Sequence, residues 1–404
     1  MNGFREECGV FGIWNSQEAA RWTYLGLYSI QHRGQESAGI VSLYQGQHLQ
    51  HRGLGLVGDV FSDVILQSLK GTAAIGHVRY STTGQNLLAN AQPLSASLLN
   101  GPVSLAHNGN IVNNESLRRK LQEKGAIFQG SNDTEILLHL LAQHPSNNLE
   151  TALKDSLNEI KGAFSLVVLA HDRLMAARDP WGFRPLVLGK KSQDDGSFSW
   201  VLASETCAFD LIGADFVREI EPGELWWVDH AGEHSLRFAE KPRKAHCVFE
   251  HVYFSRPDSI VFGDSVYVAR KAFGAQLAQE KPVAADIVIP VPDSGVPAAL
   301  GYSQTSGIPF EMGIIRNHYV GRTFIQPHQS IRDFGVKIKL NPQKHLIEGK
   351  RVIVIDDSLV RGTTSKKVIN LLKEAGAKEV HMRIAAPPTK GPCYYGVDTP
   401  HRQQ

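Results

Sequence analysis

The sequence has few cysteines, no long apolar run and no excess of charge of either sign. Its four cysteines, Cys8, Cys207, Cys247 and Cys393, lie far apart and include no C-x-x-C pair, which excludes a disulfide scaffold and a zinc finger. No stretch approaches the roughly 18 apolar residues of a membrane helix, and the start, MNGFREECG, is too polar for a signal peptide. We therefore expect a cytoplasmic protein without membrane contact.

The charges are almost balanced, because the chain has 42 Lys and Arg residues and 40 Asp and Glu residues. The net charge is therefore +2. Such a balance is not typical of proteins that bind nucleic acid, so no nucleic-acid partner is expected. The hydrophobic share of 42% is that of a globular protein and excludes wholesale disorder. With 404 residues, the chain is long enough for two or three domains.

The first half contains short strand-like segments separated by turns. These segments are ECGVFGIW, SAGIVSLY, GTAAIGHVRYSTTG, GPVSLAHNGNIVN, GAFSLVVLA and LMAARDP. Helical patterns interrupt them at 18–30, 114–124 and 134–142, and Asp133 and Thr134 are predicted to cap the third. Clustered strands with few helices between them predict an α+β sandwich rather than a doubly wound sheet.

The second half has a different pattern. After a connector, EKPRKAHCVFEHVYFSRPDS, Val- and Ile-rich strands alternate with helices twice, as in KRVIVIDDSLVRGTTSKKVINLLKEAGAKEVHMRI. This alternation predicts an α/β domain with a parallel sheet, whose ligands bind at the carboxyl ends of the strands. The boundary is expected near 235–250, which gives domains at 8–240 and 241–404.

The segment IDDSLVRGTTS places two adjacent carboxylates, Asp356 and Asp357, at the end of a buried strand. The small and hydroxyl residues that follow, before a helix, can hold a phosphate with backbone N–H groups. Adjacent carboxylates can bind vicinal hydroxyls or a hydrated Mg²⁺, which prefers one or two carboxylates plus substrate phosphates. The alternative is an acidic strand end followed by a helix cap.

This segment resembles the phosphoribosyl pyrophosphate (PRPP) signature of type I phosphoribosyltransferases. The resemblance implies that Asp356 and Asp357 bind the ribose hydroxyls and Mg²⁺, and that PVPDSGVPAA is the pyrophosphate loop, with Ser294 near the metal. The implied PRPP-binding residues are Asp293, Ser294, Lys337, Asp356, Asp357, Ser358, Arg361, Gly362, Thr363, Thr364 and Ser365. Taken alone, Asp293–Gly295 can also be a plain turn.

Between these two loops lies a long segment, RNHYVGRTFIQPHQSIRDFGVKIKL, which carries Arg322, Lys337 and Lys339. Loops of this length in compact domains are typically lids. Basic groups on a lid would neutralise the departing pyrophosphate and exclude water. The alternative is a solvated basic face.

Cys8 near the start could be a small buried hydrophobic residue. It is followed, in order, by QHRGQESAGI, GHVRYSTTG, HNGNIVN and SNDTE, and this set resembles the class II, N-terminal-nucleophile glutamine amidotransferases. In that family the nucleophile is the first residue and its own α-amino group is the general base, since a free α-amine titrates near pH 8. The resemblance implies that residues 1–7 are a propeptide cleaved before Cys8.

The same resemblance implies roles for further residues of the first half. Asn108 and the N–H of Gly109 would form the oxyanion hole. Arg79 would pair with the glutamine α-carboxylate, Asp133 would bind the α-ammonium, and Arg33 would shape the glutamine pocket. As alternatives, Asp133 could be only a helix cap and Arg79 a surface strand residue.

Both halves, in this order, resemble the glutamine phosphoribosylpyrophosphate amidotransferase family. The resemblance implies that ammonia released from glutamine attacks PRPP and gives 5-phosphoribosylamine, pyrophosphate and glutamate, the first committed step of de novo purine synthesis. Tyr253, Arg256 and Asp258 of the connector would couple the two sites and let ammonia pass inside the protein. A homodimer or homotetramer with feedback inhibition by AMP and GMP nucleotides is also implied.

The iron–sulfur branch of this family binds a [4Fe–4S] cluster through four cysteines, and Cys247 and Cys393 match the first two positions. The other two positions would lie beyond Gln404, and Cys207 lies in the other domain. Two thiolates do not hold a cubane, so the sequence predicts either a truncated chain or no cluster. Two buried free thiols are the alternative reading.

Three rival functions stay open at this point. Another glutaminase fusion, such as glucosamine-6-phosphate synthase or asparagine synthetase, shares the first half but has no use for IDDSLVRGTTS. A non-catalytic PRPP-sensing regulatory protein would be expected to carry a degraded first half or a DNA-binding appendage. A truncated protein that folds without activity is the third.

Overall fold

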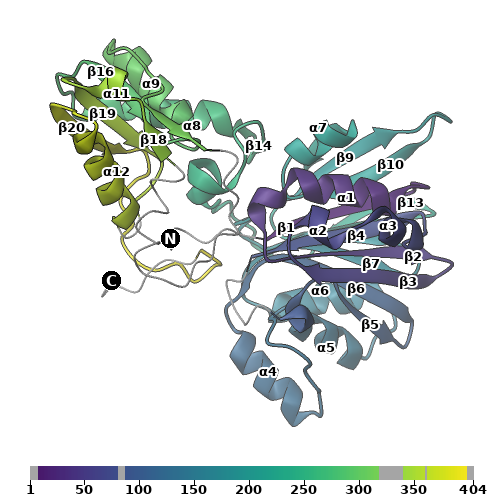
Figure 1. Ribbon diagram of the computed structural model, residues 1–404. Coiled ribbons are helices and arrows are strands. Elements are labelled where there is room, and N and C mark those ends of the chain that lie inside the picture. The colour runs from purple at the N-terminus through teal and green to yellow at the C-terminus, as the bar shows by residue number, and fades with distance from the viewer. Residues whose placement is uncertain (1–7, 81–86, 318–339, 360–361, 398–404) are drawn as a thin grey trace.

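The computed structural model describes residues 8–80, 87–317, 340–359 and 362–397, and Figure 1 shows them as two parts joined by a connector. The first part contains two antiparallel sheets, and the second contains a parallel sheet of three strands. Among the described helices, none combines the length and apolar character needed to cross a membrane.

The first sheet has seven antiparallel strands in the order β11-β9-β10-β1-β4-β2-β3. They are β1 (Gly9–Trp14), β2 (Ser37–Tyr44), β3 (Gln47–Leu54), β4 (Ala73–Arg79), β9 (Val187–Ser192), β10 (Phe198–Ala203) and β11 (Asp215–Glu219). The helices packed on its outer face are α1 (Ala19–Ser29), α2 (Val57–Val60), α3 (Asp63–Ser68) and α7 (Cys207–Ile212).

The second sheet has six antiparallel strands in the order β13-β12-β8-β7-β6-β5. They are β5 (Leu94–Leu98), β6 (Gly101–Ile111), β7 (Gly162–Ala170), β8 (Leu174–Arg178), β12 (Glu224–Asp229) and β13 (Gly232–Arg237). The helices on its outer face are α4 (Asn114–Glu123), α5 (Glu135–Gln143) and α6 (Leu149–Glu159). Two short 3₁₀ turns, η1 (Gln31–Arg33) and η2 (Leu88–Asn90), complete this part.

The two sheets are apolar on both faces because each is covered on both sides. In β1, Phe11 and Ile13 pack under the helices, whereas Val10 and Trp14 point at the other sheet. This two-residue period places one core between the sheets and one beneath each helical layer. The result is a helix–sheet–sheet–helix sandwich, which confirms the α+β fold predicted for the first half.

The predicted capping of the third helix is wrong. Thr134 stands at the N-cap of α5 but makes no side-chain cap hydrogen bond. Its hydroxyl is bonded instead to Gln92 and His107, and Asp133 accepts from the N–H of Ile111. Both side chains thus serve a polar network at the end of β6 rather than the helix end.

The second part follows a stretch, 238–247, without helix or strand, in which the proposed boundary at 240/241 lies. Its helices and turns are η3 (Glu250–Phe254), α8 (Val266–Glu280), α9 (Val296–Ser306), α11 (Lys344–Ile347) and α12 (Thr363–Glu374). Its strands are β14 (Ile260–Val261), β15 (Asp264–Ser265), β16 (Ile287–Pro290), β17 (Ile314–Arg316), β18 (Leu340–Pro342), β19 (Arg351–Asp356) and β20 (Glu379–Ile384).

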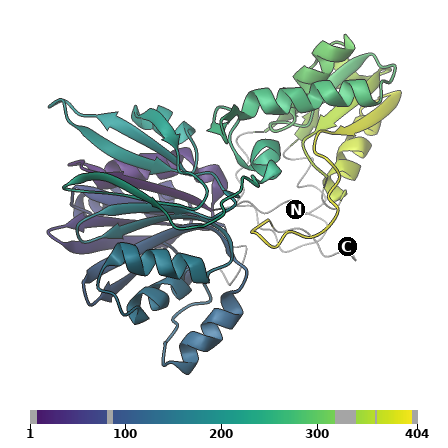
Figure 2. The same cartoon turned by 180° about the vertical axis from the view of Figure 1, so that it is seen from behind.

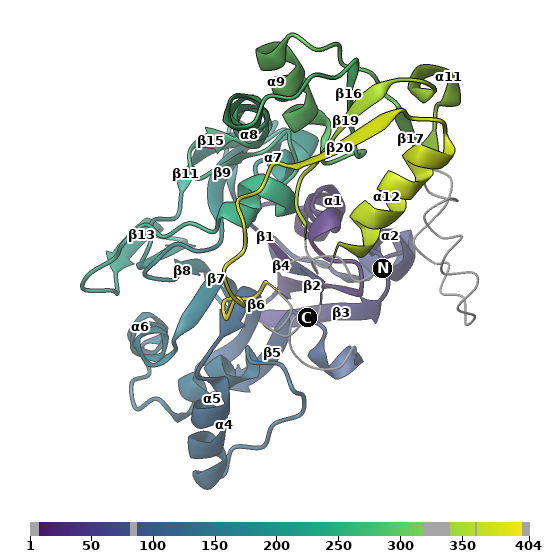
Figure 3. The same ribbon diagram turned by 90° about the vertical axis from the view of Figure 1, so that its left-hand side faces the viewer.

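The strands β16, β19 and β20 form the parallel sheet that the alternating pattern predicts. Helices α8 and α9 pack on one face, and α12 packs on the other (Figure 2). The strand β17 does not join this sheet but pairs with β18 in a separate hairpin. Beyond β20 the chain returns to the first part (Figure 3), where the carbonyl of Tyr394 accepts from Asn110 Nδ2 at 2.9 Å.

Candidate active sites

Cys8 directly precedes β1, which lies between β10 and β4 in the first sheet. Its thiol is half-buried, and Sγ lies 3.6 Å from the carbonyl of Tyr80, at the end of β4. The Cys8 carbonyl accepts from Nε of Arg33 at 3.1 Å. The nucleophile predicted from the sequence is therefore fixed through its main chain, with its sulfur at the ends of neighbouring strands.

A small pocket, about 20 Å³ in volume, opens beside this thiol. The residues that line it are Cys8, Arg79, Tyr80, Gln92, His107, Gly109, Asn132 and Asp133. Four of these, Cys8, Arg79, Gly109 and Asp133, are residues that the sequence assigned to the glutamine site. His107, Asn132 and Tyr80 were not assigned to the site from the sequence, although they stand inside the quoted motifs HNGNIVN, SNDTE and GHVRYSTTG, and no sequence pattern pointed to Gln92.

The end of β6 carries the two predicted oxyanion donors. Asn108 is fully buried, and neither Nδ2 nor Oδ1 of its amide has a hydrogen-bond partner among the described residues. A buried amide without partners is costly, so this group fits a site completed by a ligand. Gly109 has φ +148°, and a Cβ there would lie 2.0 Å from the carbonyl oxygen of Ala163, so only glycine fits.

Buried polar groups hold the pocket wall in place. The N–H of His107 donates to Gln92 Oε1 at 2.7 Å, and its Nδ1 is bonded to Thr134 Oγ1 at 2.9 Å. Asp133 Oδ2 accepts from the N–H of Ile111 at 2.8 Å, and its other oxygen lies 3.8 Å from His107 Nδ1. Burial lowers the pKa of His107, which keeps the imidazole neutral at physiological pH.

Arg33 takes part in a buried ion cluster beside the pocket. Its guanidinium donates to Glu205 Oε1 at 2.6 Å and to the two carboxylate oxygens of Glu250 at 2.8 and 2.9 Å. Arg33 is not one of the described residues that line the pocket. Its hydrogen bond to the Cys8 carbonyl is the contact through which it acts on the site.

The second site lies at the end of β19, in the middle of the parallel sheet. Asp356 and Asp357 are both buried, and Ser358 Oγ donates to Asp357 Oδ1. Burial and the neighbouring charge of Asp357 raise the pKa of Asp356 to about 8. Burial also raises the pKa of Asp357, although hydrogen bonds from Ser294 and Ser358 oppose the rise.

The Ser294 bond brings the predicted pyrophosphate loop, between β16 and α9, to the acidic strand end. Next to it, Asp293 is exposed and forms a 2.5 Å ion pair with Arg316. Gly362 has φ +69° and stands at the N-cap of α12, with open space around it. In the first turn of α12, Thr364 is exposed and Ser365 is buried.

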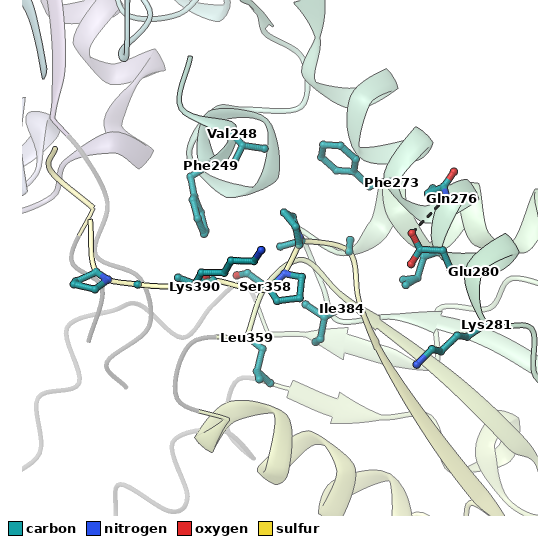
Figure 4. Close-up of a pocket in the computed structure, with 18 residues that line it drawn as sticks. Val248, Phe249, Phe273, Gln276, Glu280, Lys281, Ser358, Leu359, Ile384 and Lys390 are labelled. Atoms are coloured by element: carbon teal, nitrogen blue, oxygen red, sulfur yellow. Dashed lines mark hydrogen bonds between the residues drawn. The ribbon is translucent and has the colours of Figure 1, made fainter. Parts of the chain in front are cut away.

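Several predicted residues lie outside the described part of the chain. They are residues 1–7, Arg322, Lys337, Lys339 and Arg361, and the side chain of Thr363. Beside the described end of the loop, Ser358 and Leu359 line a cavity of about 1030 Å³ (Figure 4). Helix α8, the connector and the segment that follows β20 form its other walls, with Phe249, Phe273 and Lys390 among them.

The predicted magnesium site and the predicted iron–sulfur ligands differ in their donor atoms. Two adjacent carboxylates with a serine hydroxyl fit Mg²⁺, which takes oxygen ligands and completes its shell with substrate phosphates. The thiols of Cys247 and Cys393 pack into one apolar cluster with Phe254 and Val397. Two thiolates alone do not hold a four-iron cubane, and within the described segments no group of three or more His, Cys, Asp or Glu residues could hold a metal at either predicted site.

Comparison with known proteins gives a family match for each half of the chain. A glutamine amidotransferase domain model matches residues 77–210, and a phosphoribosyl transferase domain model matches residues 267–398. The chain is 55% identical over 402 residues to a chloroplastic amidophosphoribosyltransferase of Glycine max, covering 99% of this chain and 70% of that one. It is 48% identical over 400 residues to the amidophosphoribosyltransferase of Bacillus subtilis, covering 99% of this chain and 83% of that one.

Solved structures agree with these matches over the whole fold. A structure described as the allosteric regulatory enzyme of purine biosynthesis superposes with a TM-score of 0.93 at 48% identity, covering 98% of this chain and 84% of that one. The glutamine PRPP amidotransferase from B. subtilis, complexed with ADP and GMP, gives a TM-score of 0.91 at 48% identity, covering 98% and 85%. The chain therefore belongs to the amidophosphoribosyltransferase family.

Proposed function

We propose that this enzyme hydrolyses glutamine at Cys8 and transfers the ammonia to PRPP. The products are glutamate, pyrophosphate and 5-phosphoribosylamine, as in the first committed step of de novo purine synthesis. The observation that carries the proposal is the convergence of Cys8, Arg79, Gly109 and Asp133 on one pocket. The same chain ends a parallel strand with the acidic pair Asp356 and Asp357.

Glutamine hydrolysis begins with the thiol of Cys8. After cleavage behind residue 7, the α-amine of Cys8 accepts the thiol proton, and the sulfur attacks the glutamine amide carbon. Asn108 Nδ2 and the N–H of Gly109 donate to the developing oxyanion, and each such donor is worth about 3–4 kcal/mol. The amine returns the proton to the leaving ammonia, and water then hydrolyses the thioester to glutamate.

Two charged side chains select glutamine. Arg79 is buried at the pocket wall, where its guanidinium can take the α-carboxylate with two hydrogen bonds. Asp133 faces the same pocket and would bind the α-ammonium. Because His107 stays neutral, it adds no positive charge that would compete with the ammonium for Asp133.

At the second site, Asp356 and Asp357 would hold the ribose hydroxyls, and the loop that follows would hold the 5-phosphate. Two buried neighbouring carboxylates are unfavourable by themselves, so a bound cation stabilises their ionised forms. Mg²⁺, when bound there, would neutralise pyrophosphate as it leaves. Ammonia then attacks the anomeric carbon, the C–O bond to pyrophosphate breaks, and the amine loses a proton.

Ammonia must reach this carbon unprotonated, because in water at neutral pH it is mostly ammonium and not nucleophilic. We therefore place its route inside the protein, along the connector that carries Tyr253. Purine nucleotides are proposed as inhibitors, since the B. subtilis relative was solved with ADP and GMP.

Isotope transfer tests the proposal directly. The enzyme, with its N-terminus at Cys8 confirmed by mass, is given amide-¹⁵N glutamine and Mg²⁺–PRPP in a large excess of unlabelled ammonium. The expected result is ¹⁵N in the trapped 5-phosphoribosylamine. Unlabelled product would show that the two reactions do not share ammonia inside the protein. If no product formed at all, the proposed function would be wrong.

A further inference from the structure

The two proposed oxyanion donors, Asn108 and Gly109, stand in a part of β6 that has a neighbouring strand on one side. Strand β5 pairs with β6 over 101–105, whereas β7 pairs with it over 103–111. Among the described strands, β7 alone therefore pairs with residues 106–111, which we call the oxyanion segment. An oxyanion donor must lie about 2.7–3.1 Å from the developing charge, so the aim of this segment depends on what contacts its other edge.

Side chains cover that other edge on both sides of Gly109. The N–H of His107 donates to Gln92 Oε1 at 2.7 Å, and the N–H of Ile111 donates to Asp133 Oδ2 at 2.8 Å. Because N–H groups alternate between the two edges of a strand, the N–H of Gly109, midway between these two, faces the same edge. The strand thus turns this N–H toward the pocket that Gln92 and Asp133 also line.

The chain beyond β20 returns to the first part, and we call its residues 394–396 the strap (Figure 3). The carbonyl of Tyr395 accepts from NH2 of Arg184 at 2.7 Å, and the Tyr395 ring stacks on Phe183 with 4.5 Å between the centroids. Arg184 is fully buried, and its own carbonyl accepts from Oγ of Ser165, on β7, at 3.2 Å. The strap is therefore fixed to the strand that pairs with the oxyanion segment.

The strap also contacts the oxyanion segment itself. The carbonyl of Tyr394 accepts from Asn110 Nδ2 at 2.9 Å, and Oδ1 of the same amide is buried without a hydrogen-bond partner among the described residues. Gly396 has φ +109°, and a Cβ there would lie 3.2 Å from NH2 of Arg184 and 3.7 Å from the carbonyl carbon of Gly109. A side chain at this position would strain the backbone and crowd Arg184, so glycine lets the strap lie this close to β6.

We propose that Tyr395 and Gly396 are positioning residues that hold the oxyanion segment in the geometry of glutamine hydrolysis. This inference deepens the proposed function and rests on it. Neither residue is among the described residues that line the pocket, so both act through Asn110, which directly follows Gly109. If the strap is displaced, the end of β6 shifts, and its two donors lose their aim at the developing oxyanion.

A strap that only tethers the two parts of the chain would behave differently. Oxyanion donors act on the transition state, so a positioning role lowers kcat for glutamine hydrolysis and leaves KM nearly unchanged. Alkylation of Cys8 by iodoacetamide displaces iodide and forms no oxyanion, so a positioning role leaves its rate unchanged. Loss of a mere tether would instead alter alkylation, ammonia-dependent synthesis or KM together with kcat.

The test uses matched variants of the whole chain. Gly396→Ala is compared with Gly391→Ala, because a Cβ at Gly391 would meet nothing within 4 Å. Tyr395→Ala removes the ring stack on Phe183, whereas Tyr395→Phe keeps it. For each variant, steady-state kinetics of glutamate release are measured, together with synthesis from added ammonium and the rate of Cys8 alkylation by mass spectrometry.

A third pair tests the contact with β6 itself. Asn110→Ala removes the hydrogen bond to the strap carbonyl. Asn113→Ala is its control, because Asn113 Nδ2 donates to the carbonyl of Glu159 at 3.0 Å, a bond of the same kind that lies within the first part.

Gly396→Ala, Tyr395→Ala and Asn110→Ala should each lower kcat for glutamate release by about tenfold, less than the loss of about 10²- to 10³-fold for an absent donor. KM for glutamine, Cys8 alkylation and ammonia-dependent synthesis should match the wild type. Gly391→Ala, Tyr395→Phe and Asn113→Ala should match the wild type in every measurement. An unchanged kcat in the first three variants overturns the proposal, and so does an equal loss in the controls or a parallel loss of alkylation.

The wild type separates this inference from the proposed function. If the wild type releases glutamate and makes 5-phosphoribosylamine while the strap variants keep its kcat, this inference is wrong and the proposed function stands. If the wild type with its N-terminus at Cys8 releases no glutamate, the proposed function and this inference are both wrong.

Discussion

The proposed glutamine pocket is lined by residues from five separate segments of the chain, between Cys8 and Asp133. The proposed sugar-phosphate site takes most of its predicted residues from one continuous segment, 356–365. In the pocket, polar groups such as His107 and Asp133 are held by partners from other segments. At the acidic strand end, two neighbouring carboxylates lie buried together. The difference is that partners within the protein hold most charged and polar groups of the pocket, whereas the two carboxylates at the strand end lie side by side with their pKa values raised.

Removing the proposed nucleophile should produce the largest difference between glutamine-dependent and ammonia-dependent synthesis. Cys8→Ala should lower glutamine-dependent synthesis by at least about a thousandfold, because no other group can form the thioester. Ammonia-dependent synthesis should persist, since the second site needs only the ammonia. The two rates are measured side by side on folded protein. Equal loss of both would mean that the sites do not divide the reaction as described.

Removing an oxyanion donor should lower glutamine hydrolysis by a smaller factor than removing Cys8. Asn108→Ala should lower kcat for glutamine hydrolysis by about 10²- to 10³-fold with little change in KM, since the donor acts on the transition state. Steady-state kinetics of glutamate release measure both constants. A rise in KM at constant kcat would assign Asn108 to substrate binding instead.

Removing a carboxylate charge at the acidic strand end should instead lower both glutamine-dependent and ammonia-dependent synthesis. Asp357→Asn should lower kcat/KM for PRPP by about 10- to 100-fold with either nitrogen source, because hydrogen bonds to a charged group are lost. Asp293→Asn is the matched comparison, and it should cost less because that carboxylate is exposed and paired with Arg316. The reverse order would place ribose recognition on the pyrophosphate loop.

The two regions should also respond to pH in opposite directions. Burial lowers the pKa of His77 to about 3 and lowers that of His107, so the first part loses stability as pH falls below about 6.5, by up to about 1.4 kcal/mol per pH unit for each histidine. The pKa of Asp356 is raised to about 8, so the acidic strand end loses stability as pH rises from about 4 to 8.

Separate probes can follow the two pH responses. All six tryptophans lie before residue 230, so their fluorescence during urea unfolding follows the first part. Hydrogen exchange of peptides that cover 351–356 follows the second, after correction for the intrinsic pH dependence of exchange. If the stability of both regions changed with pH in the same direction, the predicted difference between them would be wrong.

The same contrast explains what can be predicted from the sequence. The acidic loop is one contiguous segment, and the Val- and Ile-rich strands are continuous apolar runs, so both are predictable. The third helix is also predictable, but its cap is not, because Thr134 bonds instead to Gln92 and His107.

The buried ion pairs of Arg33 with Glu205 and Glu250 could not be predicted from local sequence. Glu205 and Glu250 lie 172 and 217 residues from Arg33, and no local pattern pairs such distant charges. The motif containing Arg33 points to the glutamine pocket, yet its guanidinium is bonded to these two carboxylates and to the Cys8 carbonyl. Only the fold shows that this arginine links the nucleophile to the connector.

Coupling between the two proposed sites can be tested by counting the products of both reactions. Glutamate and pyrophosphate are measured in the same tube, with glutamine present and Mg²⁺–PRPP added or withheld, using protein whose N-terminus is Cys8. Glutamate release should rise with PRPP and match pyrophosphate one for one. Glutamate formed without pyrophosphate, at a rate that PRPP does not change, would show that the two sites are not coupled.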